Sequence, residues 1–375
     1  MASYLGDEWP IQMPDGTEYN GQDLLAFVRA QKSPMAPGWD VNTLMNELHQ
    51  LLGSPILDIP QVTAGSNHYG LKVITAGQEQ LLVRLARDDV NHPAFDGFPL
   101  AAQVADVRFE SAVYKLLDGA PEVSAARLLH SRCPRLSRKD DSFPSAELYG
   151  RRLFVFQHAE GEAQVWSELP EMGKMHLLKE AAKIRAALFN VQVPPTFSRY
   201  WLAERLFTPK PEKISVAVGP TRAFCLALLT AKLQATIGEL GDMIGWPDDN
   251  QVVGPRAYRA RGQLLAILPN ILPPDDDALY RLVVEHGDFG IHNMTITSHP
   301  HVPTVTSVFD WETACIVPAL LSDPAMAVEV DLVLDEEANP KVTRTPDNVP
   351  DEQQNLYTTW TNRYFEVAKP RSYTM

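Results

Sequence analysis

Three side chains that carry oxygen ligands, Asp288, Asn293 and Asp310, stand in two polar segments of the chain. The first segment follows the apolar run 282–284, and the second ends the strand-like run 304–309. Because neighbouring strands joined by short connections bring their ends together, we expect the three side chains to converge at one end of a small hairpin-like unit.

Phosphoryl transfer requires such a set of side chains. The reaction needs a carboxylate that orients an attacking hydroxyl and accepts its proton, and it needs oxygen ligands for magnesium at the phosphates. Asp288 suits the first role, and Asn293 with Asp310 suits the second. Alone, Asp288 could be a turn residue and Asp310 a turn cap, but their combination favours the functional interpretation.

The histidines on either side of Asp288 raise an alternative. His286 and His292, with Asp288 as a third ligand, would describe a metal hydrolase site. No third histidine or second carboxylate stands at ligand spacing. We therefore expect His286 to pack structurally and orient the loop, and His292 to be incidental.

The sequence resembles the kinase-fold family of aminoglycoside phosphotransferases and choline-kinase-like enzymes, most closely the fungal members. The family's catalytic loop, His-Gly-Asp followed by Asn, appears as His286-Gly287-Asp288 and Asn293, and its second metal motif appears as Asp310-Trp311-Glu312. The resemblance implies that Asp288 is the catalytic base and that Asn293 and Asp310 bind Mg²⁺. Pro318 and Asp323-Pro324 match a downstream pattern that braces the family's catalytic loop.

The resemblance extends through the N-terminal part and implies ATP binding there. The residues that it places at the nucleotide are Gly65, Ser66 and Asn67 in the covering loop, Arg84 and Glu110 as the phosphate-pairing cation and its acid, and Phe156 and His158 at the adenine hinge. Two departures are visible: arginine replaces the family's lysine at 84, and the covering loop is poor in glycine. Residues 65–67 could equally form a simple hairpin turn, and Phe156 could be strand core.

The surrounding pattern predicts an α+β fold with two lobes, and the resemblance implies that this fold is protein-kinase-like. Residues 71–75 and 80–85 read as a hairpin, 152–156 as a strand, and 104–117 as a helix, whereas helical periodicity dominates after Gly161. Because strands and helices are segregated, a doubly wound sheet is disfavoured. We expect a helical extension at 1–54, a nucleotide-binding lobe at 55–160, and a helical lobe with the catalytic loop and substrate site at 161–375.

Composition limits the class of partner. The chain has 375 residues, with 47 acidic against 33 Lys and Arg side chains, a net charge of −14 and 45% hydrophobic residues. An acidic surface repels phosphate backbones, so neither nucleic acid nor a membrane is the expected partner. Three scattered cysteines and the absence of a signal-like or membrane-spanning segment lead us to expect a cytoplasmic protein.

The sequence therefore predicts a Mg-ATP-dependent phosphotransferase that acts on a hydroxyl of a small molecule, a metabolite or an antibiotic-like acceptor. A protein acceptor is disfavoured because no Ala-Pro-Glu segment follows Asp310. Two alternatives stay open: a kinase-fold binding or regulatory protein without turnover, and a metabolite enzyme with ATP-independent acid–base chemistry. The identity of the acceptor, ATP against GTP, and the oligomeric state stay open as well.

Aromatic residues beside acids are the candidate substrate contacts, because they would suit a cationic or amine-bearing acceptor. These aromatic residues could instead be core or helix-packing residues. The candidates are Tyr200, Trp201, Trp246, Trp311 and Glu312.

Overall fold

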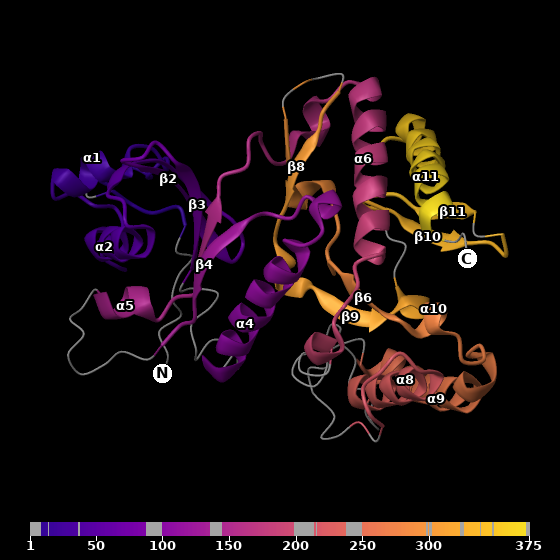
Figure 1. The fold of residues 1–375 in the computed structure, drawn as a ribbon. Coiled ribbons are helices and arrows are strands. Elements are labelled where there is room, and N and C mark those ends of the chain that lie inside the picture. The colour runs from indigo at the N-terminus through magenta and orange to yellow at the C-terminus, as the bar shows by residue number, and fades with distance from the viewer. Residues whose placement is uncertain are drawn as a thin grey trace. The chain divides into compact units, whose positions relative to one another are not determined.

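The computed structural model of the chain divides into two compact units (Figure 1). Unit 1 consists of Met1–Gly119 and Ala125–Gly161, and unit 2 of Ala120–Ser124 and Glu162–Met375. The structure describes residues 9–13, 15–36, 38–87, 100–135, 145–198, 214, 216–237, 250–297, 299, 302–322, 326–337, 339–346 and 349–372.

Unit 1 is built on a five-stranded antiparallel sheet with the strand order β1-β2-β3-β5-β4. The strands are β1 (Ile56–Ala64), β2 (His68–Thr75), β3 (Gln80–Ala86), β4 (Leu128–Arg132) and β5 (Leu153–Gln157). Buried and less buried residues alternate along β2 and β3, as in strands that have one face on a core. The predicted hairpin and the predicted strand near residue 152 are confirmed.

Four helices of unit 1 are described: α1 (Leu24–Arg29), α2 (Val41–Leu52), α4 (Leu100–Leu117) and α5 (Ser145–Tyr149). Helix α2 begins after Asp40, whose carboxylate accepts hydrogen bonds from the backbone N–H groups of Asn42 and Thr43. It ends at Gly53, whose φ of 64° suits glycine. Side chains of α1, α2 and β1–β3 share one core, so the described part of the predicted extension 1–54 packs on the sheet.

Unit 2 is mainly helical. Its α-helices within the described ranges are α6 (Glu171–Phe189), α8 (Arg222–Thr236), α9 (Asn250–Ile271), α10 (Asp277–Tyr280) and α11 (Asp351–Ser372). The strands described in this unit form three antiparallel pairs: β6 (Leu282–Glu285) with β9 (Cys315–Pro318), β7 (Met294–Ile296) with β8 (Val305–Val308), and β10 (Asp331–Leu334) with β11 (Pro340–Arg344). A sheet unit followed by a mainly helical unit confirms the predicted α+β architecture with two lobes. Within the described ranges, no helix has the length and apolar character needed to cross a bilayer.

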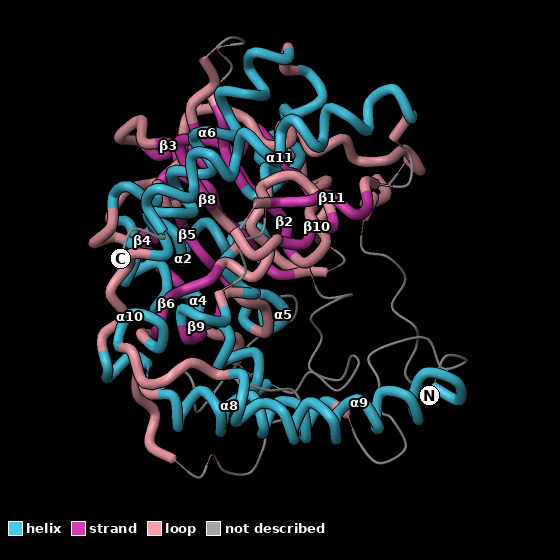
Figure 2. The backbone as a smooth tube through the Cα atoms, turned by 90° about the vertical axis from the view of Figure 1, so that its right-hand side faces the viewer, coloured by secondary structure: helices cyan, strands magenta, loops and turns pink. Residues whose placement is uncertain are grey.

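The last helix of unit 2, α11, packs along α6 (Figures 1 and 2). Trp360 of α11 is 4% exposed. Its Nε1 donates a hydrogen bond to Glu171 Oε1 at 2.6 Å, and its ring lies 5.1 Å from that of Trp166. These contacts dock α11 on α6 within this unit.

Candidate functional site

Two short segments of unit 2 carry the three candidate side chains. Asp288 and Asn293 lie between β6 and β7, with Asn293 at the end of a short 3₁₀ helix, Ile291–Asn293, and Asp310 lies between β8 and β9. Because β6 pairs with β9 and β7 with β8, the two segments face each other. The backbone N–H of Phe309 donates to the Asn293 carbonyl oxygen at 3.0 Å. Asp310 therefore directly follows a residue that is bound to the catalytic-loop candidate Asn293.

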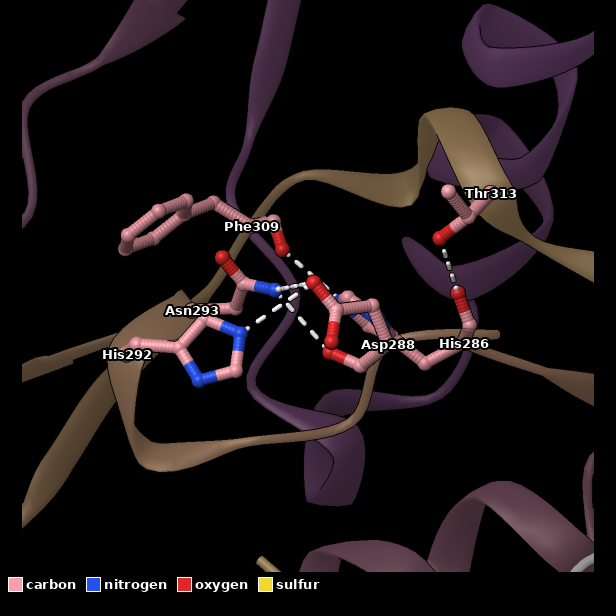
Figure 3. A network of polar contacts seen from close by, with 6 residues as sticks. All are labelled: His286, Asp288, His292, Asn293, Phe309 and Thr313. Atoms are coloured by element: carbon pink, nitrogen blue, oxygen red, sulfur yellow. Dashed lines mark hydrogen bonds and ion pairs between the residues drawn. The ribbon is translucent and has the colours of Figure 1, made fainter. Parts of the chain in front are cut away.

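The Asn293 side chain is aimed at Asp288 (Figure 3). Its Nδ2 lies 2.9 Å from the Asp288 carbonyl oxygen and 3.0 Å from Asp288 Oδ2. Both partner atoms are acceptors, so the amide must present its NH₂ group to them, and its Oδ1 faces elsewhere. The loop thus fixes which end of the Asn293 amide is available to a ligand.

His292 is the second group on Asp288 (Figure 3). Its Nε2 lies 3.1 Å from Asp288 Oδ2, the oxygen that Asn293 also contacts. Partial burial by itself raises the pKa of Asp288, but hydrogen bonds from His292 and Asn293 outweigh it, and the pKa falls below 3.8. Asp288 is therefore ionised at neutral pH. His292, which was expected to be incidental, is thus in direct contact with Asp288. No spacing rule reveals a contact between exposed side chains within one loop.

His286 holds the base of the loop from inside the unit. It is 1% exposed, its Nε2 lies 2.8 Å from the Phe309 carbonyl oxygen, and its ring lies 4.4 Å from that of Trp311. Burial lowers the pKa of His286, and this outweighs the opposing Phe309 hydrogen bond and the nearby carboxylates of Asp310 and Asp288. A neutral His286 donates to Phe309 and so ties the two segments together, which is the packing role expected of it.

The backbone of Gly287 lies close to Thr313 of the second segment. Its φ is 79°, and a Cβ at this position would lie 2.2 Å from the Thr313 carbonyl oxygen. Thr313 Oγ1 in turn donates to the His286 carbonyl oxygen at 3.0 Å. Only glycine fits this conformation and this contact without a shift of the backbone.

A buried polar network lies directly before the loop, at the end of β6. Arg185 of α6 has its Nη2 3.1 Å from Glu285 Oε1 and 2.8 Å from Ser322 Oγ. Ser322 Oγ donates to Glu285 Oε1 at 2.6 Å. The Arg185 and Glu285 side chains are only 10% and 13% exposed. These three residues fix the strand that leads into Asp288, and the sequence alone did not reveal them.

In unit 1, Arg84 and Glu110 form the ion pair that the sequence predicts between strand and helix. Arg84 Nη1 of β3 lies 3.2 Å from Glu110 Oε1 of α4, and these side chains are 11% and 1% exposed. The guanidinium of Arg84 makes a second contact, which the sequence did not predict: its Nη2 lies 3.2 Å from His68 Nδ1. Since a guanidinium only donates, His68 Nδ1 is the acceptor. Arg84 is therefore held from two sides.

The other candidates for the nucleotide lie in the same unit. Residues 65–67 form the turn between β1 and β2, in which the Gly65 N–H donates to the His68 carbonyl oxygen at 2.8 Å. Arg87 also holds this turn by two hydrogen bonds. Its Nη1 donates to the Gly65 carbonyl oxygen at 3.0 Å, and its backbone N–H donates to the Asn67 carbonyl oxygen at 3.0 Å. The turn includes Ser66, which lies between these two residues. A hairpin turn, one of the two expected forms, is thus present, and any contact of these residues with a nucleotide stays a prediction.

Phe156 and His158, the predicted hinge residues, lie on β5 and just after it. Phe156 is 2% exposed, and its ring lies 4.9 Å from that of Tyr114 and 6.1 Å from that of Phe154. It is therefore core in this unit. Burial, with Lys72 nearby, lowers the pKa of the half-buried His158, and its backbone N–H donates to the Gln80 carbonyl oxygen at 3.1 Å.

The predicted substrate residues divide into two groups. Tyr200, Trp201 and Trp246 lie outside the described residues, as does Asp323-Pro324 of the predicted brace. Trp311 is 0% exposed, and its Nε1 donates to the Val308 carbonyl oxygen at 3.1 Å. It therefore packs beneath the loop against His286 and does not present a surface to a substrate. Glu312 follows it in the 3₁₀ helix Trp311–Thr313 and is half-buried.

The donor set fits magnesium better than a metal that needs a full protein cage. Across the residues that the structure describes, no three His, Cys, Asp or Glu side chains gather into a metal-binding group. Magnesium usually keeps several waters and takes one or two protein oxygens together with phosphate oxygens. An amide oxygen from Asn293, whose orientation is fixed by Asp288, and a carboxylate from Asp310 are ligands of this kind.

Comparison with known proteins gives similarities at the level of solved structures. No family model matches the chain, and no curated protein sequence matches it. One similar structure is spectinomycin phosphotransferase APH(9)-Ia with ADP and spectinomycin, at 12% identity and TM-score 0.37, over 74% of this chain and 70% of that chain. Another similar structure is that of amicoumacin kinase hAmiN with AMP-PNP, Ca²⁺ and Ami. It is 11% identical with a TM-score of 0.38, and the match covers 79% of this chain and 68% of that chain.

A third similar structure is the macrolide 2′-phosphotransferase MphH from Brachybacterium faecium. It is 16% identical with TM-score 0.35, over 74% of each chain.

Proposed function

We propose that this protein is a Mg-ATP-dependent phosphotransferase whose acceptor is a hydroxyl group of a small molecule. One observation carries the proposal: the Asp288 carboxylate receives both neighbouring donors, Asn293 Nδ2 and His292 Nε2, on the single oxygen Oδ2. The side chain is 58% exposed. Its Oδ1 has no protein partner among the described residues and is available to a substrate hydroxyl.

Asp288 is the general base in this proposal. Its pKa lies below the ordinary value of 3.8, because the hydrogen bonds from His292 and Asn293 outweigh the effect of burial. It is therefore ionised at neutral pH and can orient an acceptor hydroxyl and take its proton as the bond to phosphorus forms. Such a weak base serves mainly by alignment, since its proton affinity is far below that of an alkoxide.

Asn293 and Asp310 are the proposed ligands of Mg²⁺. The ion, when bound, offsets the negative charge of the ATP phosphates. The amide of Asn293 serves this role because Asp288 accepts from its NH₂ end, so that its oxygen faces elsewhere. In unit 1, Arg84 is proposed to pair with phosphate oxygens of the nucleotide, with its guanidinium oriented by Glu110 and His68.

A small-molecule acceptor is favoured over a protein. After Asp310 the chain continues through Trp311-Glu312 into β9, and no Ala-Pro-Glu segment follows. The proposal includes neither nucleic acid nor membrane as a partner, in keeping with the net charge of −14.

The test is a screen of hydroxyl-bearing acceptors with Mg-ATP, in which the parent is compared with Asp288→Asn and Asp288→Ala. Both variants are expected to lose turnover by at least about 100-fold with little change in ATP affinity. Asp331→Asn, an exposed position at the start of β10, is the matched control and is expected to leave turnover unchanged. Equal turnover in the parent and in Asp288→Asn contradicts the proposal.

The same screen separates the alternatives. Tight ATP binding without turnover for any acceptor would indicate a binding or regulatory protein. Turnover that persists after magnesium is chelated would indicate acid–base chemistry that does not use ATP.

A further inference from the structure

Unit 2 contains a cavity of about 620 Å³ apart from the catalytic-loop candidates. Three segments line it: the chain that follows α6, the loop that precedes α8, and the residues from α10 to the first residue of β6. The described residues of the loop 286–293 are not among its lining residues. Because the cavity lies at Leu282, where β6 begins, and Asp288 follows the other end of β6, the cavity is a separate feature. Its volume is within the range of small-molecule sites, roughly 300–1,000 Å³.

The walls of the cavity are mostly apolar. They include the side chains of Val191, Val193, Pro195, Val218, Pro220 and Leu282. The buried Ser198 is also in the lining, but its hydroxyl already donates to the Pro194 carbonyl oxygen at 3.2 Å. A ligand with an apolar body would therefore fit most of this surface.

Arg281 is the cation of the cavity, and it is rigidly held. Its Nη1 donates to the Phe189 carbonyl oxygen at 2.7 Å, and its guanidinium carbon lies 4.4 Å from the centre of the Phe189 ring. Its backbone N–H donates to the Asp277 carbonyl oxygen at 2.9 Å, and its carbonyl oxygen accepts from Ala319 at 2.8 Å. Nε and Nη2 have no acceptor among the described residues. One edge of a fixed guanidinium is thus unused.

Among the described lining residues, no ion pair balances the charge of Arg281. Asp277 is the acidic lining residue, but it is exposed and forms no ion pair with Arg281 within the described chain. Partial burial also lowers the pKa of Arg281, which marks a cation that has lost part of its hydration. Arginine stays protonated under these conditions. A planar anion would replace the lost water by paired hydrogen bonds to the free edge.

We propose that this cavity binds a small carboxylate with an apolar body, whose carboxylate pairs with Arg281 and whose hydrocarbon part packs on the valine and proline walls. The site is independent of the proposed phosphotransfer, since it shares no residue with the Asp288 loop. The ligand class follows from one unused guanidinium edge and a mostly apolar lining, in which Gln192, Ser198 and Asp277 are the other polar residues.

Octanoate and octanol are the matched probes, because they share an apolar chain and differ in the carboxylate. Binding to the full-length protein is measured by calorimetry and by the shift of its melting temperature. Octanoate is expected to bind saturably and raise the melting temperature, and octanol to bind at least about tenfold more weakly. Equal affinity for the two probes, or no saturable binding of octanoate, would overturn the proposal.

Two variants test the location. Arg281→Gln removes the charge and is expected to weaken octanoate at least about tenfold, whereas Arg259→Gln, on the exposed surface of α9, is the control and should bind like the parent. Gly219→Leu places a side chain in the lining, where an added Cβ meets no atom within 4 Å, and is expected to abolish binding. Because Gly219→Leu keeps Arg281 and its hydrogen bond to Phe189, it tests the location of the binding site even if Arg281→Gln does not fold. Parental affinity in a folded Gly219→Leu would overturn the proposal.

Discussion

Asn293 donates both of its side-chain hydrogen bonds to Asp288, at 2.9 Å to the carbonyl oxygen and 3.0 Å to Oδ2. The two side chains therefore depend on each other: Asp288 sets the orientation of the Asn293 amide, and Asn293 holds the Asp288 carboxylate in place and, after His292, helps to lower its pKa. A change at either residue must therefore affect the other.

Asn293→Ala removes a proposed magnesium ligand together with two hydrogen bonds to Asp288. We expect turnover to fall about 10- to 100-fold and the Mg²⁺ concentration for half-maximal activity to rise. The magnesium dependence of the initial rate at saturating ATP measures both effects. A fall in turnover with an unchanged magnesium midpoint would show that Asn293 positions Asp288 but does not bind the ion.

Asn293→Asp is the matched companion, because it keeps an oxygen ligand but replaces the donor NH₂ by a like charge. Asp288 then loses a hydrogen bond and gains a repulsive neighbour, so its pKa must rise. The acid limb of the pH–rate profile is expected to shift to higher pH relative to the parent. An unshifted acid limb would contradict the coupling of the two side chains.

Gly287→Ala is expected to disrupt the loop through its backbone. Alanine at a φ of 79° is strained, and its Cβ would lie 2.2 Å from the Thr313 carbonyl oxygen, so the two segments must move apart. We expect a loss of at least about 2 kcal/mol in the free energy of unfolding. Denaturant unfolding at neutral pH measures it.

The control is Gly262→Ala in α9, where an added Cβ meets nothing within 4 Å and the φ is ordinary. This change should stabilise the protein by about 0.5–1 kcal/mol, because alanine favours the helix. Equal stability of Gly287→Ala and the parent would mean that the approach to Thr313 is not a constraint in solution.

The placing of Asp288 and Asn293 together in one loop could be predicted from the sequence, because the signals for it are local. Asp288 and Asn293 share one short loop, and the apolar runs on either side of it form the strands that hold it. The partners of Arg185 could not be predicted in this way. Glu285 is 100 residues away along the chain and Ser322 is 137 residues away, and no periodicity or spacing connects the three.

The contact between His68 and Arg84 could not be predicted from the sequence either, because it depends on the register of two strands. In the β2–β3 pair, His68 lies opposite Ala86 and Arg84 lies opposite Gly70. His68 and Arg84 are therefore diagonal neighbours on the same face, and Gly70 offers no side chain between them. The hairpin was predictable, but a shift of one residue in its register would have turned these side chains to opposite faces.

The buried network of Arg185, Glu285 and Ser322 gives a stability prediction. Arg185→Leu leaves the Glu285 carboxylate buried without its cation and is expected to cost about 3–5 kcal/mol. The double change Arg185→Leu with Glu285→Leu removes both charges, so it should cost clearly less than the single change. The free energies of unfolding of the parent, both single variants and the double variant, measured with denaturant, give the interaction energy by a double-mutant cycle. Additive losses would show that Arg185 and Glu285 do not interact.

His68 gives a prediction about pH. Burial, with the positive charges of Arg84 and Arg152, holds the pKa of His68 well below its ordinary value of 6.5. The unfolded chain therefore takes up a proton below about pH 6.5 that the folded chain does not take up. Stability must fall as the pH is lowered through that range, by up to about 1.4 kcal/mol for each pH unit. Above pH 6.5 the contribution of His68 is constant.

His68→Asn isolates this effect. An asparagine oxygen can replace Nδ1 as the acceptor for Arg84, and the side chain does not titrate. It also removes His68 Nε2, which is buried without a hydrogen-bond partner. Unfolding free energies of the parent and of His68→Asn, measured from pH 7.5 down to pH 5, should diverge below pH 6.5, with the parent losing more. The neutral, buried His286 adds a slope of the same sign to both proteins, so it cancels in the difference. Parallel curves would show that His68 is protonated in the folded protein and cannot be the acceptor that holds Arg84.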